Sequence, residues 1–248
     1  LRGRRPDEWP MEVGLGLAVT GKWFNRRRRV PLLVRSGAGR ARTSHLTSTY
    51  FDTPDKQLAA AGINLRIREI GNRRLQTLKL GSGWQAGITE RVEIEGWVRT
   101  DRPTLDLIHV PEVRDFLCKD EIWERLQPVF VTDFRRTSRQ LDFTGQFGDA
   151  TISVDLDSGE IRSGNRTAAI SELELELKAG SPTALYDLAH AINEQVPLRI
   201  EHRGKAARAA AKATAKATAK AVAKSERKRK RKQSLKRWTR RLKQWCAF

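Results

Sequence analysis

The ten residues 171–180 read SELELELKAG and carry a charged side chain at every second position from 172 to 178. Successive side chains of a β-strand point to opposite faces, so this pattern predicts a strand with leucines on one face and charges on the other. Like charges that share a face repel each other, and a solvated face usually mixes the two signs. The charged face is therefore either an ordinary solvent-exposed surface or one that meets something polar inside the fold.

Short segments with the same period of two recur along the chain and are separated by turn residues. This arrangement is typical of an antiparallel, β-rich domain. The expected strands cover residues 12–19, 46–51, 63–70, 75–80, 89–98, 129–143, 151–156, 160–163 and 168–178. Ser181-Pro182 and the apolar pattern after it predict an amphipathic helix that ends before Pro197. Shorter helices are expected at 28–36, 53–61 and 111–117.

Several of these strands combine an apolar face with a face that mixes acids and bases. Arg66 and Arg68 alternate with Leu65 and Ile67, and the segments RVEIE (91–95) and VDLD (154–157) repeat the arrangement. Four or five such strands indicate a closed sheet whose charged faces look inward at one another, with helices and loops over the apolar outside. The predicted fold class is thus α+β and β-dominated, a closed antiparallel barrel with peripheral helices.

Charges inside such a barrel must be paired or bound to ions, because an unpaired buried charge is strongly unfavourable. Clustered arginines and lysines suit phosphate oxygens, whereas clustered carboxylates hold hard divalent cations such as Mg²⁺. Together they predict a site for a polyphosphate chain with its metal.

Much of the net charge of +19 belongs to the C-terminus, where residues 205–248 hold 17 of the 48 basic residues and one of the 29 acidic residues. Cys118 and Cys246 are far apart, and no run of about 18 apolar residues occurs. We therefore expect a cytoplasmic protein without a disulfide framework or a transmembrane segment. Met11 is the only methionine, so residues 1–10 are expected to be a disordered extension.

Eight short motifs follow one another along the chain. They are YFDTPDKQL (50–58), LRIRE (65–69), LQTLKLG (75–81), RVEIE (91–95), FVTDFRRTS (130–138), VDLDSG (154–159), SELELELK (171–178) and RGKAARA (203–209). Residues 11–209 with these motifs resemble the CYTH, or triphosphate tunnel metalloenzyme, superfamily, most closely the bacterial inorganic triphosphatases, in which a helical, basic CHAD domain commonly follows. The resemblance implies a tunnel of eight antiparallel strands that binds a triphosphate and hydrolyses it with Mg²⁺ or Mn²⁺.

The resemblance also implies roles for individual residues. The expected phosphate-binding residues are Arg66, Arg68, Lys79, Arg91, Arg136, Lys178, Lys205 and Arg208. The expected metal ligands are Glu12, Asp155, Glu172, Glu174 and Glu176, and the expected catalytic residues are Glu12, Glu93, Glu95 and Lys79. A metal-activated water can attack the terminal phosphorus, so no nucleophilic side chain is required. Asp157 is expected to be a turn residue ahead of Gly159, and the four histidines are expected to be structural or surface residues.

The first strand departs from the pattern of the superfamily, which reads ExExK with two carboxylates and a lysine on one face. The segment here is MEVGLGLAV, which keeps Glu12 but has Gly14 and Gly16 at the other two positions. Catalytic groups that act as a unit often lose orders of magnitude in rate when one is removed. Two functions stay open: a metal-dependent triphosphatase, and a catalytically inactive protein that binds polyphosphate or nucleic acid through the tunnel and the tail.

The tail, residues 210–248, contains lysines four residues apart on an alanine-rich background, followed by the run SERKRKRK. Leu235, Trp238, Leu242 and Trp245 then fall at helical spacing with basic residues between them, which predicts a basic amphipathic helix. We expect this tail to contact nucleic acid or polyphosphate. The alternatives are an anchor to an anionic membrane and a remnant of a following CHAD-like segment without a role of its own.

Overall fold

The computed structural model describes residues 11–19, 40–85, 88–146, 148–201 and 205, with the side chains of residues 82–85 excepted. Four predictions lie outside the described residues: the extension at 1–10, the helix at 28–36, Arg208 and the tail 210–248. Within the described part of the chain, no helix is long and apolar enough to cross a membrane.

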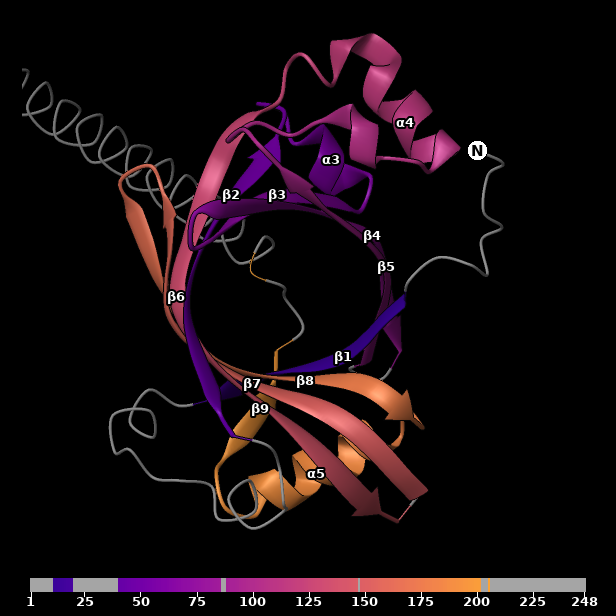
Figure 1. The fold of residues 1–248 in the computed structure, drawn as a ribbon, viewed down its shortest axis with the longest axis vertical. Helices are drawn as coiled ribbons and strands as arrows, with labels where there is room; N and C mark the ends of the chain where they lie inside the picture. Colours follow the sequence, from indigo (N-terminus) through magenta and orange to yellow (C-terminus); the bar gives the residue numbers. More distant parts are fainter. Residues whose placement is uncertain (1–10, 20–39, 86–87, 147, 202–204, 206–248) are drawn as a thin grey trace, which may run out of the picture. The chain divides into compact units, whose positions relative to one another are not determined.

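Eight antiparallel strands close into a barrel, which Figure 1 shows end-on. They are β1 (Met11–Val19), β2 (Arg42–Asp52), β3 (Ile63–Ile70), β4 (Arg73–Gln85), β5 (Ile88–Val98), β6 (Gln127–Gly145), β7 (Gly148–Ser163) and β8 (Arg166–Gly180). Around the barrel the order is β1, β5, β4, β3, β2, β6, β7, β8 and back to β1. A short ninth strand, β9 (Leu198–Ile200), pairs with the end of β1. The predicted closed antiparallel barrel of eight strands is confirmed.

The prediction of two separate strands at 151–156 and 160–163 is wrong, because β7 runs without a break from Gly148 to Ser163. Gly159, which suggested a turn, instead lies within β7, where it is the register partner of Phe134 on the neighbouring strand β6. A Cβ atom at position 159 would come within 2.2 Å of the carbonyl oxygen of Asp133 and 2.4 Å of the Cα of Phe134. The glycine thus permits a close approach of the two paired strands, which a single sequence does not distinguish from a turn.

Helices cover the outside of the barrel at two places (Figure 1). On one side lie α3 (Gln57–Ala60), the 3₁₀ turns η2 (Leu105–Leu107) and η3 (Lys119–Glu121), and α4 (Pro111–Cys118); on the other lies α5 (Ala184–Asn193). The helix predicted after Ser181-Pro182 is confirmed as α5, and the helix predicted at 111–117 as α4. The helix expected at 53–61 is shorter, because residues 53–56 form a turn that leads into α3.

The hydrophobic core lies outside the barrel, between the strands and these helices. One cluster joins α5 to the outer faces of β1, β7 and β8, where Leu173 and Leu175 pack with Leu185 and Leu188. A second cluster joins the outer faces of β3 and β4 to α3, α4 and η3. The leucines of the SELELELK segment therefore face a core, as their alternation with charges predicts, and the charges are turned into the barrel.

The side chain of Asp52, at the end of β2, fixes the turn at residues 53–56, which lies within the motif YFDTPDKQL. Its buried carboxylate accepts hydrogen bonds from the backbone N–H groups of Thr53 (2.7 Å), Leu58 (2.9 Å) and Ala59 (3.2 Å). Two donors at the start of α3 and one in the turn before it are thus satisfied by one side chain, which ties α3 to the barrel.

We predict that Asp52→Ala lowers the free energy of unfolding by about 2–4 kcal/mol, because three backbone donors lose a charged acceptor in a buried turn. Urea unfolding followed by circular dichroism measures the change. Asp55→Ala is the matched control, since Asp55 lies in the same turn but is exposed and pairs with Arg125 at the surface. A stability for Asp52→Ala equal to that of the control would contradict this assignment.

Candidate functional site

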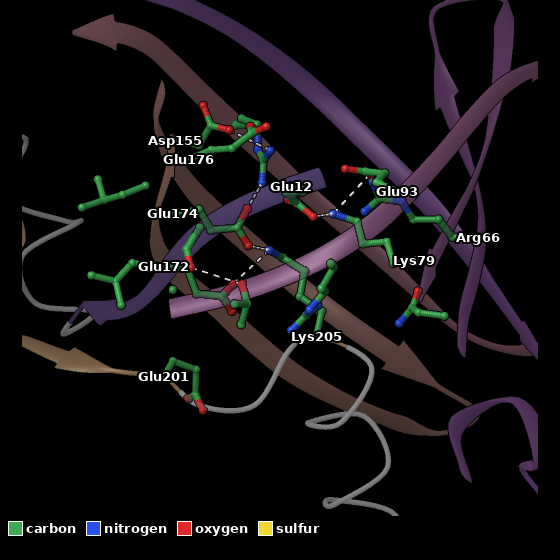
Figure 2. Close-up of a pocket in the computed structure, with 18 of the residues that line it drawn as sticks. Glu12, Arg66, Lys79, Glu93, Asp155, Glu172, Glu174, Glu176, Glu201 and Lys205 are labelled. Atoms are coloured by element: carbon green, nitrogen blue, oxygen red, sulfur yellow. Dashed lines mark hydrogen bonds and ion pairs between the residues drawn. The ribbon is translucent and has the colours of Figure 1, made fainter. Parts of the chain in front are cut away.

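Charged side chains from seven strands line a pocket of about 330 Å³ inside the barrel. Strand register explains their convergence, because residues paired across neighbouring strands share a face. Arg66 on β3 pairs with Thr77 on β4, which pairs with Glu95 on β5, and the next row joins Asn64, Lys79 and Glu93. Figure 2 shows the side chains of Arg66, Lys79 and Glu93 close together on one side of the pocket.

The described part of the pocket lining contains seven basic and eight acidic side chains. They are Arg66, Arg68, Lys79, Arg91, Arg136, Lys178, Lys205, Glu12, Glu93, Glu95, Asp155, Glu172, Glu174, Glu176 and Glu201. Every site residue that the sequence predicts, except Arg208, which is outside the described residues, is brought together here. Glu201 is an addition that the sequence patterns did not indicate.

Arg136 is the centre of the acidic side of the pocket. Its guanidinium donates to both carboxylate oxygens of Asp157 (2.7 Å each), to Asp155 (2.8 Å) and to Glu174. Burial alone would lower the pKa of Arg136, but the carboxylates of Glu174, Asp157 and Asp155 outweigh it and raise the pKa far above its usual value. This arginine is therefore a permanent cation that the surrounding acids hold in one orientation.

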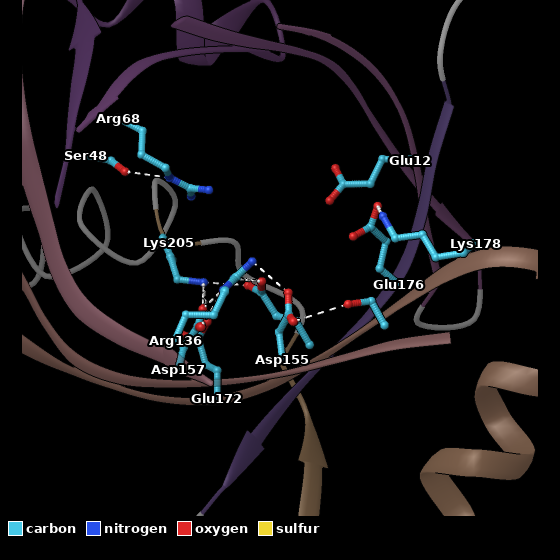
Figure 3. A network of polar contacts seen from close by, with 12 residues as sticks. Glu12, Ser48, Arg68, Arg136, Asp155, Asp157, Glu172, Glu176, Lys178 and Lys205 are labelled. Atoms are coloured by element: carbon cyan, nitrogen blue, oxygen red, sulfur yellow. Dashed lines mark hydrogen bonds and ion pairs between the residues drawn. The ribbon is translucent and has the colours of Figure 1, made fainter. Parts of the chain in front are cut away.

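Lys205 is the second cation among these acids. Its ammonium lies 2.9 Å from Asp157 Oδ2, 2.9 Å from Glu172 Oε2 and 2.5 Å from Glu174 Oε1. Burial favours the neutral amine, yet the charges of Glu174 and Asp157 raise the pKa of Lys205. Figure 3 shows Lys205 and Arg136 together above the aspartates of β7 and Glu172.

The prediction that Asp157 is a turn residue is wrong. Asp157 lies inside β7, its side chain is fully buried, and both Arg136 and Lys205 contact it. The sequence DLDSG suggested a turn because of Gly159. This glycine instead allows β7 to approach its neighbour β6 closely. Alternation with Asp155 on the same strand was the signal that could have placed Asp157 inside the barrel.

Lys79 and Glu93 form a second ionic group on the opposite wall. Lys79 pairs with Glu12 and lies 3.2 Å from Glu93. Thr77 donates a hydrogen bond of 2.6 Å to Glu95, while Arg66 lies farther from these acids, at 3.7 Å from Glu93 and 3.9 Å from Glu95. Glu12, Glu93 and Glu95 are thus oriented by neighbouring groups that belong to β3 and β4.

Arg68 and Arg91 are the tunnel cations for which no carboxylate of the described residues lies within ion-pair distance. The Nε of Arg68 donates to Ser48 Oγ at 3.1 Å (Figure 3). Burial, followed by the positive charges of Arg66 and Arg136, lowers the pKa of Arg68 to about 10. The neighbouring Arg66 has two carboxylates only at 3.7 and 3.9 Å, and its buried Nε has no hydrogen-bond partner in the described structure. Arg68 is therefore the less compensated of two adjacent guanidinium groups, an arrangement that could bind an anion.

Tyr50 is a pocket residue that our sequence reasoning missed. It stacks on Phe130, with ring centroids 4.2 Å apart, and its hydroxyl lies 3.5 Å from Arg66. Burial would raise the pKa of Tyr50, but the positive charges of Arg66 and Lys205 lower it overall. The alternation of Ser48 and Tyr50 along β2 is the signal that could have placed both side chains inside the barrel.

β1 contributes little more than backbone to its part of the pocket. Glu12 reaches Lys79, but Gly14 and Gly16 leave two inward positions without a side chain. A Cβ at position 14 would lie 3.2 Å from the carbonyl oxygen of Leu175, a tight contact, whereas a Cβ at position 16 would lie 3.5 Å from that of Glu201, an ordinary one. The structure thus places both glycines where the sequence pattern predicted tunnel positions.

Lys178 and Glu176 lie farther along β8. Their charged groups are 2.5 Å apart, and both side chains remain partly exposed. Arg91 on β5 also lines the pocket, and its buried Nε has no hydrogen-bond partner among the described groups.

Three carboxylates could hold a metal ion. One oxygen each from Asp157, Glu172 and Glu174 lie within 4.8 Å of one another. An all-carboxylate donor set suits a hard divalent cation such as Mg²⁺ or Mn²⁺. Of the expected metal ligands, Glu172 and Glu174 belong to this cluster, and Asp155 joins it through Arg136.

The fold and this pocket agree with the comparisons to known proteins. The CYTH domain family matches residues 17–210, so the chain belongs to the CYTH family. The inorganic triphosphatase of Haemophilus influenzae is 30% identical over 165 residues, which are 66% of this chain and 44% of that protein. The chain therefore spans less than half the length of this curated relative.

Similar solved structures are more distant in sequence. An adenylyl cyclase from Hippeastrum, described as having a dominant triphosphatase activity, is 17% identical with a TM-score of 0.47, over 78% of this chain and 92% of that one. A protein of Pyrococcus horikoshii is also 17% identical with a TM-score of 0.47, over 81% of this chain and 99% of that one.

We predict that the ionic network makes the protein less stable in acid. Burial would raise the pKa of Glu174, but Lys205 and Arg136 lower it well below its usual value of 4.5. A carboxylate whose pKa is lowered by folding stabilises the fold at pH values above its usual pKa. This stabilisation is lost as the pH falls through the folded-state pKa.

Between about pH 6 and pH 3, the free energy of unfolding should therefore decrease less steeply for Glu174→Gln than for the wild type. Urea unfolding at a series of pH values measures the slope. Glu124→Gln is the control, because Glu124 is exposed outside the barrel. Equal slopes for the wild type and Glu174→Gln would show that Glu174 is not held as an ion by this network.

Proposed function

We propose that the barrel binds a triphosphate and hydrolyses its terminal phosphoanhydride bond with the help of Mg²⁺ or Mn²⁺. The observation that supports this most directly is Arg68, a half-buried cation with a lowered pKa and without a carboxylate partner in the described structure. An anion between Arg66 and Arg68 would compensate both charges, and guanidinium groups bind phosphate oxygens with two parallel hydrogen bonds.

The charge balance of the tunnel supports a metal requirement. The described lining is nearly neutral, with seven bases and eight acids. A triphosphate brings about four negative charges near neutral pH, which electrostatic positioning must offset during phosphoryl transfer. The carboxylate cluster of Asp157, Glu172 and Glu174 could hold the divalent cation that offsets them.

In the proposed reaction each wall has a separate task. Arg66 and Arg68 would hold phosphate oxygens, and the carboxylates of the opposite wall would hold the metal, which would lower the pKa of bound water and neutralise developing charge. Glu93 and Glu95, oriented by Lys79 and Thr77, position the water that attacks the terminal phosphorus. The bond between that phosphorus and its bridging oxygen breaks, and orthophosphate and the shortened phosphate chain leave.

The H. influenzae relative is named an inorganic triphosphatase, which supports inorganic triphosphate as the substrate to test first. The phosphate-binding strands do not identify what lies beyond the phosphates. Thiamine triphosphate, ATP and RNA 5′-phosphates, on which other members of the superfamily act, are therefore the comparison substrates.

A second candidate is a protein that binds polyphosphate without hydrolysing it. Gly14 and Gly16 favour this candidate, because they remove a carboxylate and a lysine from the face of β1 that lines the pocket. Groups that act as a unit in catalysis lose large factors when one is removed, whereas anion binding by the opposite wall does not need them.

We predict that Arg68→Gln lowers phosphate release from inorganic tripolyphosphate at least about 100-fold, because one preorganised charge on the substrate is removed. The assay follows phosphate release with Mg²⁺ or Mn²⁺ and without metal. Arg135→Gln is the matched control, since Arg135 is the neighbour of Arg136 on β6 but is exposed on the outer face. Equal activities of the two variants would contradict a role of Arg68 in binding substrate.

The same assay separates the two candidate functions. Metal-dependent release by the wild type supports the triphosphatase. Calorimetric binding of tripolyphosphate without release, together with release by a Gly14→Glu/Gly16→Lys variant, would support the binding protein. The variant at position 14 requires β1 and β8 to separate slightly, because its Cβ meets Leu175 O at 3.2 Å.

We further propose that the tail 210–248, with its polybasic run, contacts nucleic acid or polyphosphate. Contacts between basic residues and phosphates weaken steeply as salt increases. Removal of residues 210–248 should therefore abolish salt-sensitive binding of DNA or RNA while phosphate release by the barrel remains. Unchanged nucleic-acid binding by the truncated chain would show that the tail does not carry it.

A further inference from the structure

One wall of the tunnel carries more carboxylates than its own strands neutralise. β8 and β7 supply five of them: Glu172, Glu174, Glu176, Asp155 and Asp157. β1, which is hydrogen-bonded to β8, places Gly14, Gly16 and Ala18 beside this wall, and none of the three has a charge. Carboxylates this close together need cations, because an uncompensated charge in a buried site is strongly unfavourable.

Arg136 on β6 and Lys205 are two such cations from outside β7 and β8. The ammonium of Lys205 lies within 2.9 Å of the carboxylates of Asp157, Glu172 and Glu174 and donates a hydrogen bond to Glu174. The side chain of Lys205 is only 9% exposed. Carboxylates of the protein therefore compensate its charge, so it serves the acidic wall before it can serve a phosphate.

Position 16 on β1 lies next to the same carboxylates. Gly16 is the register partner of Glu174, and Ala18 is the partner of Glu172. Partners directly opposite on antiparallel strands have Cβ atoms about 5 Å apart and share a face, and the diagonal neighbour is about 7–8 Å away. A Cβ at position 16 makes only an ordinary contact, 3.5 Å from Glu201 O, so a side chain fits there.

We propose that Lys205 is a positioning residue that supplies the ammonium which β1 lacks at position 16, and that a lysine placed at position 16 can replace it. While no metal ion occupies the carboxylate cluster, the acidic wall requires one ammonium between Glu172 and Glu174, whichever segment of the chain delivers it. With that ammonium in place, the wall keeps its geometry and does not repel an anion held by Arg66 and Arg68. Only this last consequence rests on the proposed function.

The test is a complementation experiment on the full chain. We expect Lys205→Ala to lower the melting temperature by roughly 5–15 °C, because it leaves buried carboxylates without a partner. It should also weaken calorimetric binding of tripolyphosphate at least about tenfold through repulsion by those carboxylates. Adding Gly16→Lys in the Lys205→Ala background should recover more than half of both losses.

Gly16→Gln in the same background is the matched control, since it adds a polar stem of similar length without a charge. It should recover neither loss. Equal recovery by glutamine and lysine would overturn the proposal, because filling space would then suffice. Failure of Gly16→Lys to recover the melting temperature, when Gly16→Lys alone is as stable as the wild type, would overturn it as well.

If Lys205→Ala does not fold, Lys205→Gln, which keeps most of the stem, takes its place in the same comparison. The melting temperature is measured without ligand, so this result does not depend on the proposed function. If Arg68→Gln leaves tripolyphosphate binding unchanged, the proposed function fails while recovery of the melting temperature still decides the role of Lys205. Conversely, Lys205 can prove irreplaceable while Arg68 binds the anion as proposed.

Discussion

The ionic contacts of Asp157 are the constraint on which the inside of this barrel depends. A fully buried carboxylate is tolerated only with cations in contact, and Asp157 has two, Arg136 and Lys205. Through them it is linked to Asp155, Glu172 and Glu174, so acids from two strands and bases from two other segments form one network. Removing one partner leaves its neighbours uncompensated, which makes the network sensitive to single substitutions.

This network explains why the fold is arranged with its hydrophobic core outside the barrel. A barrel of eight strands has an interior that side chains can nearly fill, and here those side chains are long and charged. The apolar faces must then be covered elsewhere, and α5 on one side and α3 with α4 on the other provide that cover (Figure 1). One face of each strand therefore packs against apolar side chains, and the other faces charged side chains inside the barrel.

The site divides into two walls with different electrostatic character. Acids that are already paired with Arg136 and Lys205 occupy one wall, and the other carries Arg68, which has no carboxylate partner among the described residues. In the proposed function a polyanion would lie against the second wall and a divalent cation against the first. The two glycines of β1 lie where the walls meet.

Period-two alternation determined most of the architecture and of the site from the sequence alone. It predicted which side chains of β3, β5 and β8 enter the barrel, because a strand can only place alternate residues on one face. The family pattern ExExK placed Gly14 and Gly16 in the tunnel, because it has a carboxylate and a lysine at these two positions. Alternation could not say which charges pair with which, since that depends on strands far apart in the sequence.

Tertiary structure decided the rest. Asp157 was read as part of a turn because Gly159 follows it closely. Only the pairing of β7 with β6, in which a Cβ at position 159 would come within 2.2 Å of the carbonyl oxygen of Asp133, shows that this glycine belongs to a continuous strand. Alternation with Ser48 along β2 could have placed Tyr50 in the pocket, whereas Glu201 entered it through the chain path, which no local pattern encodes. Lys205 was expected at phosphates, yet it lies among three carboxylates, because its position is set by where the chain passes after β9 and by the charge it finds there.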